Sequence, residues 1–188
     1  MNPARAGFTL LEIVIVFAVT LILCAAVYGL AGTGGAALSS SSIQSDLDNS
    51  LRQGVESMIS EVGQSGAGTF SPALPASLPG NSALSFQKNL GYSGGTITWG
   101  PVITYQFEYE PGETNNGLDD NNNGVVDEGI LVRIEGSRRR VLCKWVKEGG
   151  VQFALSGRKL TIRIEGIRRD KNRRTHTAFQ ETTFHVPQ

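Results

Sequence analysis

The sequence of 188 residues lacks the motifs that mark common enzyme classes. It contains no GxSxG nucleophile motif, no phosphate-binding glycine loop and no HExxH zinc motif. Its two histidines, His176 and His185, have no cysteine or histidine partner at metal-ligand spacing. Its carboxylates gather mostly in one Asp/Asn/Gly-rich segment, which suits metal binding better than acid–base chemistry. The sequence therefore predicts that the chain is not an enzyme.

Cysteine is scarce as well. Cys24 lies in an apolar N-terminal run, and Cys143 lies far away in a strand-like segment. A cysteine inside a bilayer and a cysteine inside a folded domain outside it cannot approach within disulfide distance. We therefore expect no structural disulfide, and we expect Cys143 to be a half-buried strand residue rather than a reactive thiol.

Basic residues are rare over most of the chain. Residues 1–130 carry three basic side chains against twelve acidic ones, whereas residues 131–188 carry fourteen against five. Strands commonly carry solvated charges on the face away from the core, which is the first interpretation of this excess. The alternative is a basic face that captures DNA or another acidic partner. Its residues would be Arg138, Arg139, Arg140, Arg168, Arg169, Lys171, Arg173 and Arg174.

Residues 8–30 form an almost unbroken apolar run. As a helix this run would be about 34 Å long, enough to cross a hydrocarbon core of about 30 Å. Arg5 precedes it and no further Lys or Arg occurs before Arg52, so the positive-inside rule predicts a cytoplasmic N-terminus and an exported remainder. A cleaved secretory signal, ending near Ala25 or Ala31, is the competing interpretation. Glu12 argues against it, because a carboxylate within an apolar span is costly without a purpose.

Gly7, Phe8, Thr9, Leu10, Leu11 and Glu12, followed by the apolar run, resemble the type III signal of type IV prepilins and pseudopilins. The resemblance implies that a prepilin peptidase cuts between Gly7 and Phe8 and N-methylates the new Phe8 amine. It further implies that Glu12 meets the terminal amine of a neighbouring subunit, which would compensate a buried charge. Residues 1–7 would then be the leader and residues 8–30 the single transmembrane helix.

A second helix is predicted after a flexible segment. Residues 31–42 are rich in Gly and Ser, a composition typical of a hinge or of a melted stretch of helix. Within residues 43–66, the apolar residues recur on one helical face, and Gly63 and Gly66 supply a stop. This stripe consists of Ile43, Leu47, Leu51, Val55, Met58, Ile59 and Val62. The end of this helix, MISEVGQSG, resembles that of J-type minor pseudopilins and W-type minor pilins, although Gly63 replaces their usual arginine.

Residues 67–188 read as a β-rich domain. After a proline-containing loop at residues 67–81, apolar and polar residues alternate with period two, which is typical of antiparallel strands with one solvated face. Gly149-Gly150 and Ser156-Gly157 are predicted hairpin turns. The fold class is therefore α+β, a long helix packed on an antiparallel sheet, which is also the pilin-like architecture. The predicted strands are Ala83–Gln87, Thr96–Trp99, Val102–Tyr109, Ile130–Glu135, Arg140–Val146, Val151–Leu155, Lys159–Gly166 and Ala178–Val186.

The segment at residues 111–129, PGETNNGLDDNNNGVVDEG, resembles the short calcium loops of dockerin-like and thrombospondin-like sites. Oxygen ligands at alternate positions, with glycine at the sharp turn, suit a loop that wraps a hard cation. Ile130 replaces the usual glutamate, and Glu128 is the substitute carboxylate. A solvated Asx-rich turn is the alternative. The predicted calcium ligands are Asp119, Asn121, Asn123, the Val125 carbonyl, Asp127 and Glu128.

These features together favour a minor pilin or pseudopilin, assembled at the tip of a type II secretion pseudopilus or a type IV pilus. Its predicted partners are the prepilin peptidase, other minor and major subunits and the bacterial inner membrane, with the C-terminal domain in the periplasm. A pilus-anchored module that binds nucleic acid through the basic residues is the alternative. A secreted or single-pass calcium-binding protein is a further rival.

Overall fold

The computed structural model describes residues 9–187, except for the side chains of residues 31–37. The chain divides into two units, Met1–Ser41 and Ser42–Gln188, and we call the second the sheet unit. One long helix, one short 3-10 helix and six strands make up the described residues. They are α1 (Leu10–Val62), η1 (Ala67–Thr69), β1 (Ala83–Ser93), β2 (Thr96–Tyr109), β3 (Gly129–Glu135), β4 (Arg138–Ser156), β5 (Lys159–Arg169) and β6 (Thr175–His185).

The start of α1 is an apolar helix with a polar cap. The Thr9 hydroxyl accepts a hydrogen bond of 3.3 Å from the Glu12 backbone N–H, which satisfies one of the free donors at a helix N-terminus. Residues Leu10–Leu30 have a mean hydropathy of 2.9, and none of their side chains is buried within the chain. This stretch is long and apolar enough to cross a membrane, which agrees with the predicted span at residues 8–30.

The expected break at residues 31–42 is not found, because α1 continues through it. Glycine costs about 1 kcal/mol per position in a helix relative to alanine. Starting a new helix is costlier still, because nucleation fixes several residues for a single hydrogen bond. Helical residues on both sides therefore carry the helix across the glycines.

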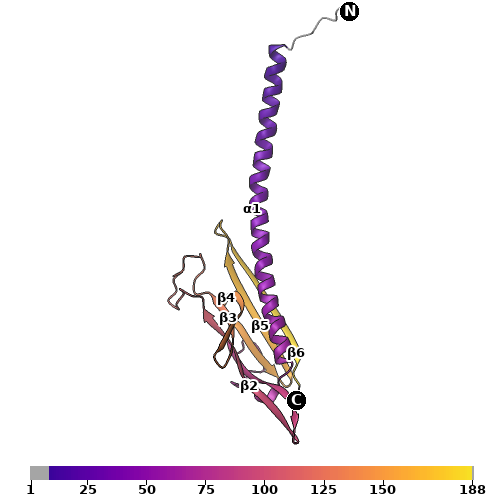
Figure 1. Cartoon of the computed structure of the whole chain (residues 1–188). Helices are drawn as coiled ribbons and strands as arrows, with labels where there is room; N and C mark the ends of the chain where they lie inside the picture. Colours follow the sequence, from indigo (N-terminus) through magenta and orange to yellow (C-terminus); the bar gives the residue numbers. More distant parts are fainter. Residues whose placement is uncertain (1–8, 188) are drawn as a thin grey trace, which may run out of the picture. The chain divides into compact units, whose positions relative to one another are not determined.

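The last turns of α1 bury the predicted apolar stripe. Leu47, Leu51, Met58 and Val62 are fully buried, and they join one hydrophobic core with side chains from the strands. The helix ends at Val62, and the Gly63 N–H bonds the Ile59 carbonyl at 2.9 Å. Both the stripe and the stop at Gly63 are therefore confirmed. Figure 1 shows the end of α1 running alongside the strands of the sheet unit.

The strands form one antiparallel sheet in the order β1-β2-β3-β4-β5-β6, so each strand pairs with its neighbours in sequence. The helical stripe and the alternating residues of the strands share a single core, since Ile162 and Ile164 of β5 are as fully buried as Leu47. A Cβ at Gly166 would lie 2.8 Å from Leu47 Cδ1, which shows how closely α1 approaches β5. The α+β fold, a helix on an antiparallel sheet, is confirmed.

Two of the predicted breaks between strands are wrong, because β2 and β4 each run through one. Thr96–Trp99 and Val102–Tyr109 form one strand, β2, and its pairing with β1 shifts register opposite Gly100 and Pro101. A proline has no N–H for the ladder, so it is tolerated at such an irregularity. Gly149-Gly150 does not close a hairpin but lies inside β4, where the register against β5 shifts between Val146 and Val151. Ser156-Gly157 does lie at the β4–β5 turn.

A polar cluster ties the end of α1 to the sheet beside the apolar core. The Glu61 carboxylate accepts hydrogen bonds from Tyr105 Oη at 2.6 Å, Arg133 Nε at 2.7 Å and Lys88 Nζ at 2.9 Å. Burial alone raises the pKa of Glu61, but these hydrogen bonds outweigh it and lower the pKa to about 2. The acidic residue of the MISEVGQSG stretch is therefore an anchor between helix and sheet.

Candidate functional site

The processing and assembly residues predicted from the sequence lie at the start of the chain. Gly7 and Phe8 are outside the described residues. Glu12 lies in the first turn of α1 with an exposed side chain, and it is the only charged residue in Leu10–Leu30. Apolar side chains surround it on all sides of the helix, with Leu10 exposed by 82% and Ile22 by 69%. A helix that is apolar all round needs lipid or another protein surface around it.

The polar atoms within this apolar helix are arranged for a dry environment. The Thr20 hydroxyl donates a 2.7 Å hydrogen bond to the Val16 carbonyl, one turn earlier in the same helix. A hydroxyl satisfied in this way does not need water, as is required of polar groups in a hydrocarbon core. The Glu12 carboxylate is the one charge in this span that has to find a partner from outside the helix.

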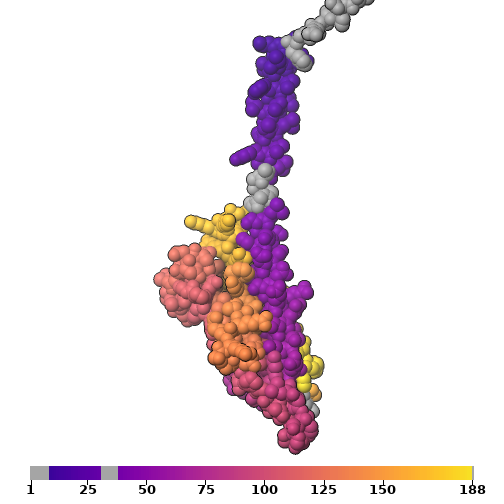
Figure 2. Space-filling view, viewed as in Figure 1, coloured from indigo at the N-terminus to yellow at the C-terminus, as the bar shows by residue number. Residues whose placement is uncertain are grey.

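The second candidate site is the Asp/Asn/Gly segment at residues 111–129, which we call the Asx lobe. Figure 2 shows it, in the colours between residues 100 and 130, as a rounded projection on the surface of the sheet unit. The lobe leaves the sheet after β2 and returns at β3, and its base is closed by a 3.2 Å hydrogen bond from the Glu110 N–H to the Glu128 carbonyl. The β2–β3 ladder therefore fixes where the lobe begins and ends.

Asparagine and aspartate side chains fold the tip of the Asx lobe. Asp119 accepts backbone N–H groups from Asn123 at 3.0 Å and Gly124 at 2.8 Å. Asn121 Oδ1 accepts from the Asn123 N–H, and Asn123 Oδ1 accepts from the Val125 N–H, each at 2.9 Å. The bonds from Asn121 to Asn123 and from Asn123 to Val125 each span two residues and form Asx turns. A segment rich in Asn and Asp favours such turns with or without a cation.

Asp127 holds the opposite side of the lobe. It is buried, with a positive φ of 52°, and its oxygens accept the N–H groups of Asn116 at 3.2 Å and Gly117 at 3.0 Å. Among the predicted calcium ligands, Asp119 and Asp127 are thus bonded to backbone donors. Asn121, Asn123 and Glu128 lie together. The side-chain amide nitrogen of Asn121 donates to Glu128 Oε1 at 3.1 Å, and that of Asn123 donates to the same oxygen.

Two buried carboxylates in the lobe each keep one oxygen without a hydrogen-bond partner. Glu128 is fully buried and Glu113 is 6% exposed, and the Oε2 atom of each is buried and unpaired. Glu113 Oε1 accepts the Asn121 N–H at 2.8 Å, so both carboxylates contact the same residue. The sequence did not identify Glu113, because it lies outside the alternating positions of a calcium loop.

The geometry that brings Glu113 to this place is a turn. Pro111 and Gly112 occupy its centre, Gly112 has φ +99°, and the Glu113 N–H bonds the Glu110 carbonyl at 2.8 Å. Proline followed by a glycine with positive φ is typical of a type II turn. The Pro-Gly pair was therefore the one local signal that the segment before the Asx residues folds back on the sheet.

Burial raises the pKa of Glu110, and its hydrogen bond and repulsion with Glu128, together with repulsion from Glu113, raise it further. Glu110 is therefore close enough to Glu128 and Glu113 for their negative charges to disfavour its own. Within residues 9–187, however, no group of three or more His, Cys, Asp and Glu side chains is arranged as a metal site by itself.

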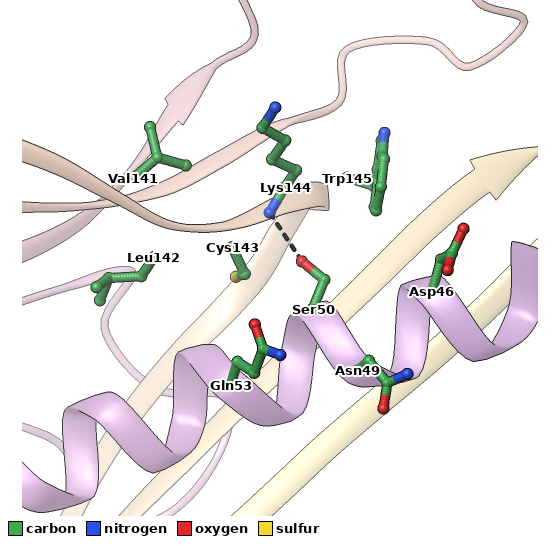
Figure 3. Close-up of a pocket in the computed structure, with 9 residues that line it drawn as sticks. All are labelled: Asp46, Asn49, Ser50, Gln53, Val141, Leu142, Cys143, Lys144 and Trp145. Carbon is green, nitrogen blue, oxygen red and sulfur yellow. Dashed lines mark hydrogen bonds between the residues drawn. The ribbon is translucent and has the colours of Figure 1, made fainter.

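A groove in the sheet unit lies between the C-terminal part of α1 and the edge of β4 (Figure 3). The Lys144 N–H of β4 donates a 3.2 Å hydrogen bond to the Ser50 hydroxyl of α1 across it. Cys143 points toward the helix and is 2% exposed, and burial raises its pKa to about 12, so the thiol stays protonated at neutral pH. The groove is lined by Asp46, Asn49, Ser50, Gln53, Val141, Leu142, Cys143, Lys144 and Trp145, which offer no activated nucleophile.

Both cysteines are free, as expected, and Cys143 is more deeply buried than the half-buried position that the sequence predicted. Gly54 of α1 makes this possible, because a Cβ at that position would lie 3.2 Å from Cys143 Sγ. A small residue on the helix thus lets β4 approach closely.

The basic side chains of residues 131–188 are distributed over several strands rather than gathered in one free patch. Many contact acidic groups, such as Arg139 with Glu108 at 2.6 Å and Lys147 with Glu165 at 2.8 Å. Arg168 lies 4.0 Å from the Trp145 ring centroid and 3.5 Å from Asp46. Among the described residues, five of the fourteen basic side chains in residues 131–188 form such ion pairs, namely Arg133, Arg139, Lys147, Arg163 and Arg168.

Residues 2–28 match the family model for the prokaryotic N-terminal methylation motif. No curated protein and no solved structure matches the chain significantly. The matched region contains the predicted leader and most of the apolar helix, so it supports a prepilin-type signal that a prepilin peptidase processes. The motif and the apolar helix Leu10–Leu30 together indicate a membrane-anchored subunit of pilin or pseudopilin type, a structural protein rather than an enzyme.

Proposed function

We propose that the chain is a minor pilin or pseudopilin, cleaved between Gly7 and Phe8, methylated on Phe8 and assembled into a filament through α1. The proposal rests on the methylation motif together with the helix that it overlaps, whose apolar surface is exposed and carries one charge, Glu12. The Glu12 carboxylate pairs with the Phe8 amine of a neighbouring subunit, because a charge in an apolar environment requires an opposite one.

The proposed orientation has the N-terminus in the cytoplasm and the sheet unit in the periplasm. Arg5 is the only basic residue before Arg52, and positive charge near a span favours the cytoplasmic side. Before assembly the helix anchors the subunit in the inner membrane. In the filament, the same apolar surface packs against other subunits. Neighbouring subunits then replace lipid around Leu10–Leu30.

A specialised position at the filament tip fits the sheet unit better than the repeating shaft. The Asx lobe and the β1–β2 hairpin, with Leu90 exposed by 64% and Tyr92 by 73%, extend the sheet unit with distinctive surfaces. The helix end MISEVGQSG supports a J-type or W-type subunit of a type II secretion pseudopilus or a type IV pilus. Reduced filament length, with normal levels of the major subunit, is the expected phenotype of deleting such an initiating subunit.

Intact mass tests the processing step. Expressed with a prepilin peptidase, the membrane-extracted chain should begin at Phe8 and carry one added methyl group. Gly7→Asp should leave the leader attached, whereas Gly29→Ala, a glycine with no atom within 4 Å of an added Cβ, should be processed normally. Glu12→Gln should be processed and methylated but should not enter filaments. Cleavage after Ala25 or Ala31 would refute the proposal.

The alternative of a pilus-anchored module that captures nucleic acid has less support, because part of its basic face is already engaged. Arg139 pairs with Glu108 of β2, and Arg168 pairs with Asp46 of α1. Arg169 donates to backbone carbonyls. It makes a separate prediction. A nucleic-acid-binding face loses affinity steeply with salt, and its affinity falls when Arg138 and Arg140, both exposed, are replaced by glutamine.

A further inference from the structure

The base of the Asx lobe has an unusual charge arrangement. Glu113 and Glu128 are buried carboxylates, and each has an Oε2 atom without a hydrogen-bond partner. A buried carboxylate oxygen without a partner is costly, and such groups are normally paired or bound to a metal. Two of them in one small lobe, both in contact with Asn121, indicate that a positive partner belongs there.

The two arginines that line the neighbouring hollow do not fill this role. Arg168 and Arg169 line the hollow that contains Asn123 and Glu128. Arg168 stacks on Trp145 and pairs with Asp46, whereas Arg169 donates to the carbonyls of Gly124 and Arg173, both at 3.0 Å. Within residues 9–187, no ion pair joins either arginine to Glu113 or Glu128.

We propose that Ca²⁺ binds between Glu113 and Glu128, with their buried carboxylates as its charged ligands and Glu110 as a third negative charge nearby. The set of ligands thereby differs from that predicted by the alternating loop positions, because it adds Glu113 and leaves Asp119 and Asp127 to fold the lobe. Carboxylate, amide and carbonyl oxygens are the ligands that Ca²⁺ accepts, in six- to eight-fold coordination. Asn121 and Asn123 donate amide N–H groups to Glu128 Oε1 and hold that carboxylate in place, so that water completes the coordination.

Elements of the fold bring these residues together without the cation. The β2–β3 ladder ends at the Tyr109–Gly129 pair. Glu110 follows β2 and Glu128 precedes β3, so these two residues lie opposite each other just beyond the ladder. The turn at Pro111-Gly112 then returns Glu113 to the same place. The cation thus joins both ends of the lobe to one point at the edge of the sheet, and it offsets the negative charge that Glu113 and Glu128 place beside Glu110.

Calorimetric titration of CaCl2 into the full-length chain in detergent, stripped with EDTA, tests the site. We expect one Ca²⁺ per chain, a higher unfolding temperature with Ca²⁺, and weaker binding of Mg²⁺, which demands stricter octahedral geometry. Glu113→Gln and Glu128→Gln should each weaken binding at least tenfold, on the order of what loss of a charged ligand causes. Asp120→Asn, an exposed acid of the same lobe, is the matched control and should bind normally.

A second measurement separates a cation site from a purely structural role. In EDTA, the two glutamine variants should unfold at the same temperature as the unsubstituted chain or higher, because they relieve repulsion. In Ca²⁺ they should unfold at a lower temperature than the unsubstituted chain. Absence of Ca²⁺ binding up to about 10 mM, well beyond the range of weak extracellular sites, would overturn the proposal. So would normal affinity of Glu113→Gln with loss of binding in Asp119→Asn, which would return the site to the alternating loop positions.

Discussion

Replacing Glu61 by glutamine should destabilise the sheet unit substantially while removing no carbon atoms. The side chain is 20% exposed and bonds Lys88, Tyr105 and Arg133, three residues of β1, β2 and β3. Burial disfavours the charge, but the three hydrogen bonds lower the pKa from 4.5 to about 2. At about 1.36 kcal/mol per pKa unit this corresponds to roughly 3 kcal/mol at neutral pH, and solvent screening of the exposed fraction reduces it to about 2 kcal/mol.

Urea unfolding of the full-length chain in detergent measures this loss. Both tryptophans, Trp99 and Trp145, lie in strands of the sheet unit, so their fluorescence follows that unit specifically. Glu56→Gln is the matched control on the same helix. Glu56 pairs only with Arg52, at 59% and 70% exposure, and its replacement should cost less than about 0.5 kcal/mol.

The pH dependence gives an independent check. Because the pKa of Glu61 is lower in the folded chain than in the unfolded chain, its stabilisation is complete above about pH 4.5. It is lost as the pH falls toward about 2, so the difference in unfolding free energy between the unsubstituted chain and Glu61→Gln should shrink over that interval. Equal unfolding free energies for Glu61→Gln and Glu56→Gln, or a difference that does not change with pH, would refute the assigned role of Glu61.

Two further predictions concern the approach of β4 to its neighbours. A Cβ at Gly150 would lie 2.5 Å from the Glu165 carbonyl oxygen, so Gly150→Ala should lower the free energy of unfolding by about 2 kcal/mol. The control Gly68→Ala, with open space around the added Cβ, should be close to neutral in the same urea assay. Cys143 is buried and burial raises its pKa to about 12, so it should resist maleimide at pH 7.5 until urea unfolds the sheet unit. Mass spectrometry of peptides containing residue 143 measures the labelling, and rapid labelling in the folded chain would contradict the prediction.

The sequence predicted the helices and the sheet most reliably where one local pattern decides the structure. The stripe from Leu47 to Val62 has four-residue spacing and needs only one apolar partner, and the alternation in Leu160, Ile162 and Ile164 likewise sets one buried face. The break in the helix expected at residues 31–42 is not found, because composition describes isolated residues, whereas a helix already formed on both sides is extended at less cost.

The bulge at Gly149-Gly150 and the position of Glu113 could not be predicted from nearby sequence alone. Two glycines suit a hairpin and a bulge equally well, and the pairing partners of β4 decide that Gly149-Gly150 is a bulge. In the same way, the spacing of Asp119, Asn121 and Asn123 describes the lobe tip alone. The position of Glu113 depends on a turn and on the closing of β2 against β3, which involves residues nearly twenty positions apart.

The order of the strands has a consequence for how the chain acquires its structure. Each strand pairs with the one that follows it, so the sheet can grow by successive hairpins with short loop closures. The helix that covers the sheet comes first in the sequence, yet its residue Leu47 packs against Gly166 of β5, almost the last part to emerge. The apolar stripe of α1 therefore remains uncovered until the C-terminal strands arrive. A chain shortened before β5 would keep a paired sheet but an unprotected helix, and it would be a target for proteolysis and aggregation.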